Sequence, residues 1–230
     1  MKVLVLGSGT GTRLYPITKI TPKTLVDIKG KPLLAYILEK LEKSNTISEI
    51  YITYNHHFED QFHKFIEHFK YTKKIELISD KDKKESEMPG SIGTINYFMK
   101  LKKINEDLLV LAGDSIFNFE IDDFINFYKK HNETSVAVYD FKDKKKVAGK
   151  YGIVELGKNQ KIINFTEKPK KPKTSLAATL CYILSNYDLH HLDKKAFREN
   201  AGELIAHLVK NEDVYGYLIK GKWFDIGTHE

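Results

Sequence analysis

The chain has 230 residues, of which 41% are hydrophobic, and its formal net charge at pH 7 is +6. This length and composition predict one globular domain, residues 1–230, with a sizeable buried core. No apolar run is long enough for a signal peptide or a membrane span, and the single cysteine, Cys181, has no partner for a disulfide within the chain. The sequence therefore predicts a cytoplasmic protein with no membrane partner.

The positive charge by itself suggests a nucleic-acid partner, but the pattern of the charged residues argues against one. Almost all basic residues are lysines, spread over the whole length and mixed with acids, as in residues 80–85. No zinc-binding spacing, helix-turn-helix string or RNP-like motif occurs. We therefore expect a solvated, lysine-rich surface and no nucleic-acid partner.

The chain opens with an apolar run, Val3–Leu6, followed by a glycine-rich loop, Gly7–Thr12, and then Arg13. The run is typical of a buried parallel strand. Glycines let backbone N–H groups surround an anion, and a guanidinium adds a planar two-pronged donor. Arg13 is one of only two arginines in a lysine-rich chain, the other being Arg198. The loop predicts a phosphorylated ligand, with an empty glycine-rich turn as the alternative.

The spacing of this loop excludes two common phosphate-binding motifs. A dinucleotide fingerprint requires a third glycine where the chain has Thr12, and Pro16 and Pro22 interrupt any long helix after the loop. A Walker A string is absent from the sequence.

The elements that follow alternate between strand and helix patterns in the first half of the chain. Strands are predicted over 49–54, 74–78, 108–111, 135–141, 151–156, 161–165, 180–184 and 214–219, and helices over 32–41, 58–69, 92–101, 122–130 and 201–210. This order predicts an α/β fold, a Rossmann-like three-layer α/β/α sandwich with a mostly parallel central sheet.

Two later segments place carboxylates after apolar or aromatic residues. The strand over 108–111 leads into Ala112-Gly113-Asp114, and ligands of an open α/β sheet bind at the carboxyl ends of its strands. A carboxylate there is able to hold Mg²⁺, although a lone Asp in this position is more often a turn or cap residue. The second segment, 221–228, contains Asp225 and the only tryptophan, Trp223.

Together these motifs resemble those of the sugar-phosphate nucleotidyltransferases, in particular glucose-1-phosphate thymidylyltransferase-like members. Gly11-Thr12-Arg13-Leu14 with Pro22-Lys23 resembles G-G-x-G-T-R-L…P-K-x-L. L-A-G-D ends at Asp114, Y-G-x-V spans 151–154, E-K-P spans 167–169 and G-x-W-x-D-I-G-T spans 221–228, in family order. The chain departs from the family at Ser8, at Ile95-Asn96 and at Ala178.

The resemblance implies transfer of a nucleoside monophosphate from a nucleoside triphosphate to a sugar 1-phosphate or similar acceptor, with Mg²⁺ as cofactor. It implies a nucleotide-binding half, residues 1–117, and an acceptor-binding half, residues 118–230, and it leaves a homo-oligomer open. Implied nucleotide-binding residues are Leu6, Gly7, Ser8, Gly9, Thr10, Gly11, Thr12, Arg13, Lys23, Gly93 and Thr94. Implied acceptor-binding residues are Asp114, Gly152, Glu167 and Lys168; Asp114 and Asp225 hold the metal, and these two with Arg13 and Lys23 are catalytic.

Several alternatives stay open beside this interpretation. One is a cytidylyltransferase acting on a phospho-alcohol such as phosphocholine, and another is a catalytically silent protein that binds nucleotide-sugars. The histidines His56, His57, His63 and His68 lack the i,i+4 spacing of a helical metal site, so we expect them on the surface. Asp80-Lys81-Asp82 resembles the D-x-D string of glycosyltransferases, but its charge-dense surroundings favour a solvated loop.

Overall fold

The computed structural model describes residues 1–9, 11–81, 90–190 and 201–227. The predicted contacts of Thr10, the second aspartate of the D-x-D string (Asp82) and the last residue of the C-terminal motif (Thr228) lie outside the described residues. The helices are α1 (Leu33–Lys43), α2 (Glu59–His68), α3 (Gly90–Lys102), α4 (Ile121–His131), α5 (Lys144–Val147), α6 (Asn186–Leu189) and α7 (Ala201–Asn211).

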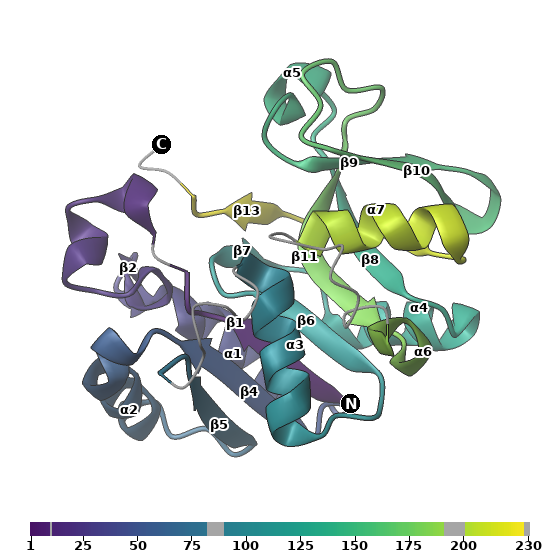
Figure 1. The fold of residues 1–230 in the computed structure, drawn as a ribbon. Helices are drawn as coiled ribbons and strands as arrows, with labels where there is room; N and C mark the ends of the chain where they lie inside the picture. Colours follow the sequence, from purple (N-terminus) through teal and green to yellow (C-terminus); the bar gives the residue numbers. More distant parts are fainter. Residues whose placement is uncertain (10, 82–89, 191–200, 228–230) are drawn as a thin grey trace.

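One nine-stranded sheet runs through the described chain (Figure 1). Its strands are β1 (Lys2–Leu6), β4 (Glu49–Tyr54), β5 (Lys74–Ser79), β6 (Leu108–Ala112), β8 (Ser135–Asp140), β9 (Gly152–Leu156), β10 (Ile162–Glu167), β11 (Leu176–Leu184) and β12 (Tyr215–Leu218). The order is β10-β9-β11-β6-β1-β4-β5, with β8 beside β11 and β12 beside β8. A short hairpin, β2 (Asp27–Ile28) with β3 (Lys31–Pro32), lies apart from it.

The strands of the first half pair in parallel, as the alternating pattern predicts. β1 lies between β4 and β6, and β4 pairs with β5, all in parallel register. The second half enters through β11, which runs antiparallel to β6, β8 and β9. Among the antiparallel pairs, β9 and β10 are joined by a short connection of the kind that a hairpin uses, whereas β11 reaches β6, β8 and β9 through longer segments.

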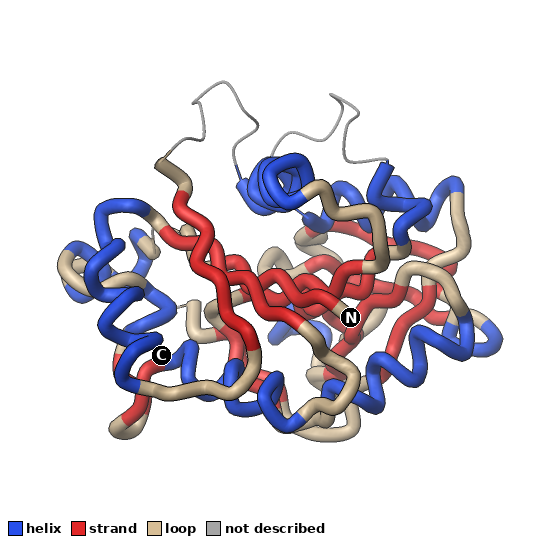
Figure 2. Tube along the Cα trace, turned by 90° about the horizontal axis from the view of Figure 1, so that it is seen from below, coloured by secondary structure: helices blue, strands red, loops and turns tan. Residues whose placement is uncertain are grey.

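Helices cover both faces of the sheet, which confirms the predicted α/β/α sandwich (Figure 2). On one face α1, α2 and α4 bury apolar residues such as Leu38, Phe62 and Phe124. On the other face α3 and α7 do so with Phe98 and Leu204. Among the described residues, no helix combines the length and apolarity that crossing a bilayer requires.

Two strands of three residues each are missing from the sequence-based prediction. β7 (Ser115–Phe117) and β13 (Trp223–Asp225) pair antiparallel, with Trp223 opposite Phe117 and Asp225 opposite Ser115. Strands this short show no readable periodicity, so the pattern of apolar residues does not reveal them. Their pairing carries the C-terminal motif to the end of β6.

Candidate active site

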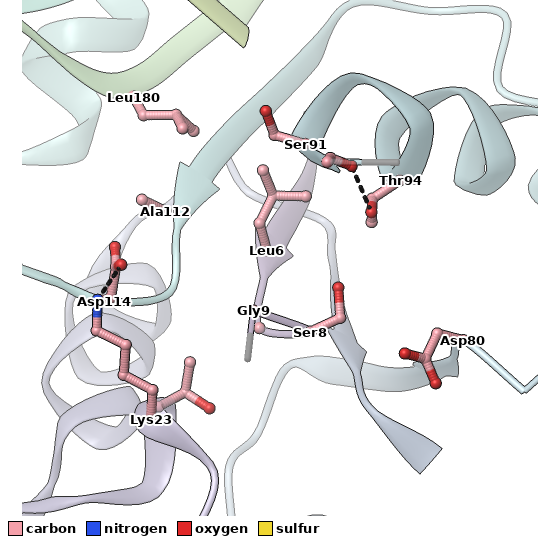
Figure 3. Close-up of a pocket in the computed structure, with 13 residues that line it drawn as sticks. Leu6, Ser8, Gly9, Lys23, Asp80, Ser91, Thr94, Ala112, Asp114 and Leu180 are labelled. Carbon is pink, nitrogen blue, oxygen red and sulfur yellow. Dashed lines mark hydrogen bonds and ion pairs between the residues drawn. The ribbon is translucent and has the colours of Figure 1, made fainter. Parts of the chain in front are cut away.

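A cavity of about 430 Å³ lies at the carboxyl ends of the parallel strands β1, β5 and β6 (Figure 3). Its walls include Leu6, Gly7, Ser8 and Gly9 after β1, Asp80 after β5, Ala112 and Asp114 after β6, and Gly90, Ser91 and Thr94 from α3. This is where an open α/β sheet offers space to a ligand. Of the predicted residues of α3, Thr94 lines the cavity, whereas Gly93 is buried in the helix.

The glycine-rich loop is held in place by its own contacts. Gly11 has a φ of 61°, and a Cβ atom there would lie 3.0 Å from Thr18 Cγ2, so both the conformation and the space favour glycine. The Thr18 hydroxyl donates to the Gly11 carbonyl at 2.7 Å. At the start of the loop, the Gly7 N–H donates to Thr53 Oγ1 at 3.0 Å. The Gly7 amide is therefore bonded to β4, although Gly7 lines the cavity together with Ser8 and Gly9.

Lys23 and Asp114 form an ion pair between the first cavity and the end of β6. The Lys23 Nζ lies 2.5 Å from Asp114 Oδ2, and only 10% of the Lys23 side chain is exposed (Figure 3). Gly113 brings the two strands together: its N–H donates to the Leu6 carbonyl, and a Cβ atom there would lie 2.6 Å from the same oxygen. The sequence motifs around Lys23 and Asp114, distant in the chain, thus meet in space.

A second cavity, of about 860 Å³, adjoins the first. The residues that line it include Arg13, Tyr151, Gly152, Glu167, Lys168, Trp223 and Asp225. Three residues line both cavities: Ala112, Asp114 and Leu180. The sequence-based interpretation placed Arg13 with the nucleotide. In the structure Arg13 lies in the helical turn η1 (Thr12–Leu14) and lines the second cavity.

Asp225 is brought to this junction by the β7–β13 pairing. The Ile226 N–H donates to the Asp114 carbonyl at 2.9 Å, which fixes the two segments side by side. Removal of water by the surrounding protein raises the pKa of Asp225, and the negative charge of Asp114 raises it further, while Lys23 and Arg13 oppose the increase. A cation placed between these two carboxylates would relieve their repulsion.

Asp114 and Asp225 are the carboxylates at this junction that a divalent cation such as Mg²⁺ would use as ligands. Among the described residues, no group of three or more His, Cys, Asp or Glu side chains comes together as a metal cage. Mg²⁺ is commonly held by one or two carboxylates together with substrate phosphates and waters, and two carboxylates, Asp114 and Asp225, line the second cavity. When bound there, the ion would neutralise charge on the phosphates.

On the far wall of the second cavity, Lys168 and Glu167 follow one another at the end of β10. The Lys168 Nζ lies 3.6 Å from Glu167 Oε1, and 55% of the Lys168 side chain is exposed. Burial raises the pKa of Glu167, and the Lys168 ammonium partly offsets this. Gly152, in the neighbouring strand β9, packs closely against two residues of β10, since a Cβ atom there would lie 2.3 Å from Phe165 Cζ and 3.0 Å from Glu167 Oε2.

Asp80 and Leu180 are among the wall residues to which the sequence assigned no role. Asp80 was considered only as part of a D-x-D string, yet it lines the first cavity and accepts from the His56 N–H at 2.8 Å. The position after a strand was the available signal. Leu180 lines both cavities, and its sequence signal was its place two residues after Ala178, where the chain departs from the family pattern. The four histidines expected on the surface are all exposed: His56, His57, His63 and His68.

The comparisons with known proteins agree with this geometry. The chain belongs to the nucleotidyl transferase family, whose model matches residues 2–230. It is 34% identical to the "Bifunctional protein GlmU" of Methanococcus maripaludis strain S2, over 99% of this chain and 51% of that protein. It is 28% identical to "Mannose-1-phosphate guanyltransferase 2" of Candida glabrata, over 99% of this chain and 61% of that protein. The chain thus spans about half the length of the curated relatives it matches.

Solved structures share the whole fold. A crystal structure of a putative glucose-1-phosphate thymidylyltransferase from Bacillus anthracis superposes with a TM-score of 0.84 at 25% identity, covering 100% of this chain and 91% of that one. A UDP-glucose pyrophosphorylase complexed with UDP-glucose gives a TM-score of 0.83 at 22% identity, covering 99% and 93%, and shows the fold alone. The fold and family expected from the motifs are therefore confirmed.

Proposed function

We propose that this chain transfers a nucleoside monophosphate from a nucleoside triphosphate to a sugar 1-phosphate, giving a nucleoside-diphosphate sugar and pyrophosphate. The observation that carries the proposal is the pair of adjoining cavities whose shared wall holds Asp114, paired with the buried Lys23 and adjacent to Asp225. A sequence relative named mannose-1-phosphate guanyltransferase and a structural neighbour named glucose-1-phosphate thymidylyltransferase belong to the same class of reaction.

The proposed chemistry needs no general base. The second pKa of a phosphate monoester is about 6, so the acceptor phosphate is largely dianionic at neutral pH. One of its oxygens attacks the α-phosphorus, a new P–O bond forms, and the bond from the α-phosphorus to the oxygen that bridges to the β-phosphate breaks. The electron pair leaves with pyrophosphate. The main barrier is the meeting of two polyanions, which positioned cations and N–H donors lower.

The described residues divide this work by position. We assign Ser8 and Gly9, with the rest of the loop, to the triphosphate, and Lys23 to the α-phosphate at the junction. Lys168 binds the acceptor phosphate in the second cavity, while Glu167 accepts hydrogen bonds from sugar hydroxyls. Because Arg13 lines the second cavity, we assign its guanidinium to the phosphates that meet there.

Asp114 and Asp225 are the proposed Mg²⁺ ligands. A divalent cation between them would relieve the repulsion that raises the pKa of Asp225. We also propose a cytoplasmic enzyme, where nucleoside triphosphates are available, and a homo-oligomer, which sedimentation would test.

The direct test is pyrophosphate release. Purified protein is incubated with Mg²⁺, one of the five common nucleoside triphosphates and one phosphate ester at a time: hexose 1-phosphates, N-acetylhexosamine 1-phosphates, phosphocholine and glycerol phosphate. Release that requires one triphosphate together with one sugar 1-phosphate supports the proposal. Release with CTP and phosphocholine supports the cytidylyltransferase alternative. Nucleotide-sugar binding without release from any pair supports the silent binding protein.

A further inference from the structure

Leu180 has a backbone conformation that is unusual for its residue type. Its φ is 48°, in the left-handed region that glycine adopts readily and a branched side chain rarely does. It lies within β11, where the register with β8 shifts between Ala178 and Tyr182. Among the described residues, no other non-glycine residue inside a strand has a positive φ. Residues held in such conformations persist where the surrounding structure fixes them, and they cluster at functional sites.

The position of Leu180 is as unusual as its conformation. It shares with Ala112 and Asp114 the property of lining both cavities, and its isobutyl group is the bulkiest of the three side chains. β11 pairs with β6 in a register that places Cys181 opposite Leu111, so Leu180 stands beside the end of β6. From there its side chain extends over the first cavity, above Ala112 (Figure 3).

We infer that Leu180 limits the size of the acceptor that the second cavity admits. This inference rests on the proposed function, in which the new phosphoanhydride forms beside Asp114. In that arrangement the acceptor atoms next to the phosphate lie at the boundary between the two cavities, and the Leu180 side chain narrows this boundary. The acceptor class that fits is a sugar 1-phosphate with nothing larger than a hydroxyl on the carbon next to the phosphate-bearing carbon. N-acetylated amino-sugar 1-phosphates carry a larger group at that carbon and are disfavoured.

The backbone strain and the side-chain volume are separable by two substitutions. Leu180→Ala removes most of the isobutyl group but keeps a Cβ atom in the left-handed conformation. Leu180→Gly removes the isobutyl group and the strain together. The matched control is Leu176→Ala in the same strand, whose register partner is Asp140 at the sheet rather than a cavity wall. A residue that only packs the bulge would change stability without changing the choice of acceptor.

The experiment compares kcat/KM for glucose 1-phosphate and N-acetylglucosamine 1-phosphate, with the triphosphate that the wild type uses. We expect the wild type to prefer glucose 1-phosphate, and both Leu180 variants to shift the ratio at least about 10-fold toward the N-acetylated acceptor. Leu176→Ala leaves the ratio unchanged. A wild type that already prefers the N-acetylated acceptor, or a ratio within twofold of wild type in both folded variants, overturns the inference.

Two readouts do not depend on turnover. If no pair of substrates gives pyrophosphate, the proposed function fails, and the affinities of the two sugar phosphates, measured by calorimetry on wild type and Leu180→Ala, then decide the inference. An unchanged ratio of affinities, or no binding by either protein, overturns it. The left-handed conformation is tested separately, because Leu180→Gly should melt about 2–4 °C above Leu180→Ala.

Discussion

Lys23 and Lys168 present the same ammonium group to adjoining cavities, yet 10% of the Lys23 side chain is exposed and 55% of the Lys168 side chain is. Lys23 is fixed by Asp114 at 2.5 Å, whereas the nearest carboxylate oxygen of Glu167 is 3.6 Å from Lys168. The first cavity is built on parallel strands and held by short contacts. The second is twice as large and built on antiparallel strands. Under the proposed function, the nucleotide side is preorganised and the acceptor side adapts to its ligand.

The largest loss of activity should follow from a substitution at the preorganised nucleotide side. Lys23→Ala removes a cation from the junction and leaves Asp114 without the partner described here, so we expect kcat to fall by about 10³-fold. Steady-state pyrophosphate release measures it. Lys19→Ala, an exposed lysine on the same segment, should stay within twofold of wild type. Comparable losses in both variants would contradict the difference in their roles.

The close contact between β1 and β6 allows a second test of the preorganised nucleotide side. Gly113→Ala places a methyl group 2.6 Å from the Leu6 carbonyl oxygen, so the backbone must move. Overpacking of this kind costs about 1–3 kcal/mol, which corresponds to roughly 3–10 °C in Tm for a chain of this size. Thermal unfolding measures the change. Gly9→Ala is the control, because a Cβ atom there meets nothing within 4 Å, and an equal Tm for the two variants would argue against the close approach.

A substitution at the acceptor side should change KM more than kcat. Lys168→Ala removes an exposed cation from the second cavity, and we expect KM for the acceptor to rise about 10-fold with kcat within threefold of wild type. Lys170→Ala, on the same lysine-rich loop, serves as control. A fall in kcat as large as that of Lys23→Ala would show that the two cavities do not differ in the way described.

The smallest expected effect concerns the junction itself and depends on pH. A carboxyl whose pKa is higher in the folded chain keeps a proton that the unfolded chain releases, so the free energy of unfolding falls as pH rises above the ordinary aspartate value of 3.8. Asp225→Asn removes this penalty. Without metal, we expect the variant to melt about 2 °C above wild type at pH 7 and no higher at pH 3. Mg²⁺ should stabilise only the wild type at pH 7, and a variant less stable than wild type without metal would refute the repulsion.

Much of the fold was predictable because local patterns of apolar and polar residues indicate its strands and helices. The apolar runs of β1, β4 and β6 separated by helical periodicities indicate a parallel sheet, and its carboxyl edge gathers Ser8, Asp80 and Asp114. Motif order predicted the family, and two of its carboxylates, Asp114 and Asp225, do lie on adjoining segments.

The remaining features depend on geometry that no local pattern encodes. The turn η1 decides which cavity Arg13 faces, and the Gly7 amide is directed to Thr53 by a hydrogen bond across the sheet. β7 and β13 are three residues each and are recognisable only once they are paired. The left-handed conformation of Leu180 is imposed by the bulge in β11, whereas its residue type favours an extended strand.

The pairing of β13 with β7 also governs when the site is complete during synthesis. Lys23 and Asp114 belong to the first half of the chain, whereas Asp225 reaches them through a ribbon that joins residues far apart in the sequence. A chain made only as far as residue 224 contains every described residue that lines the first cavity but lacks Asp225. Because a chain is made from the N-terminus onward, the second of the two proposed metal ligands is synthesised long after the first. The proposed site is therefore complete only when both strands of the β7–β13 ribbon have been made and paired.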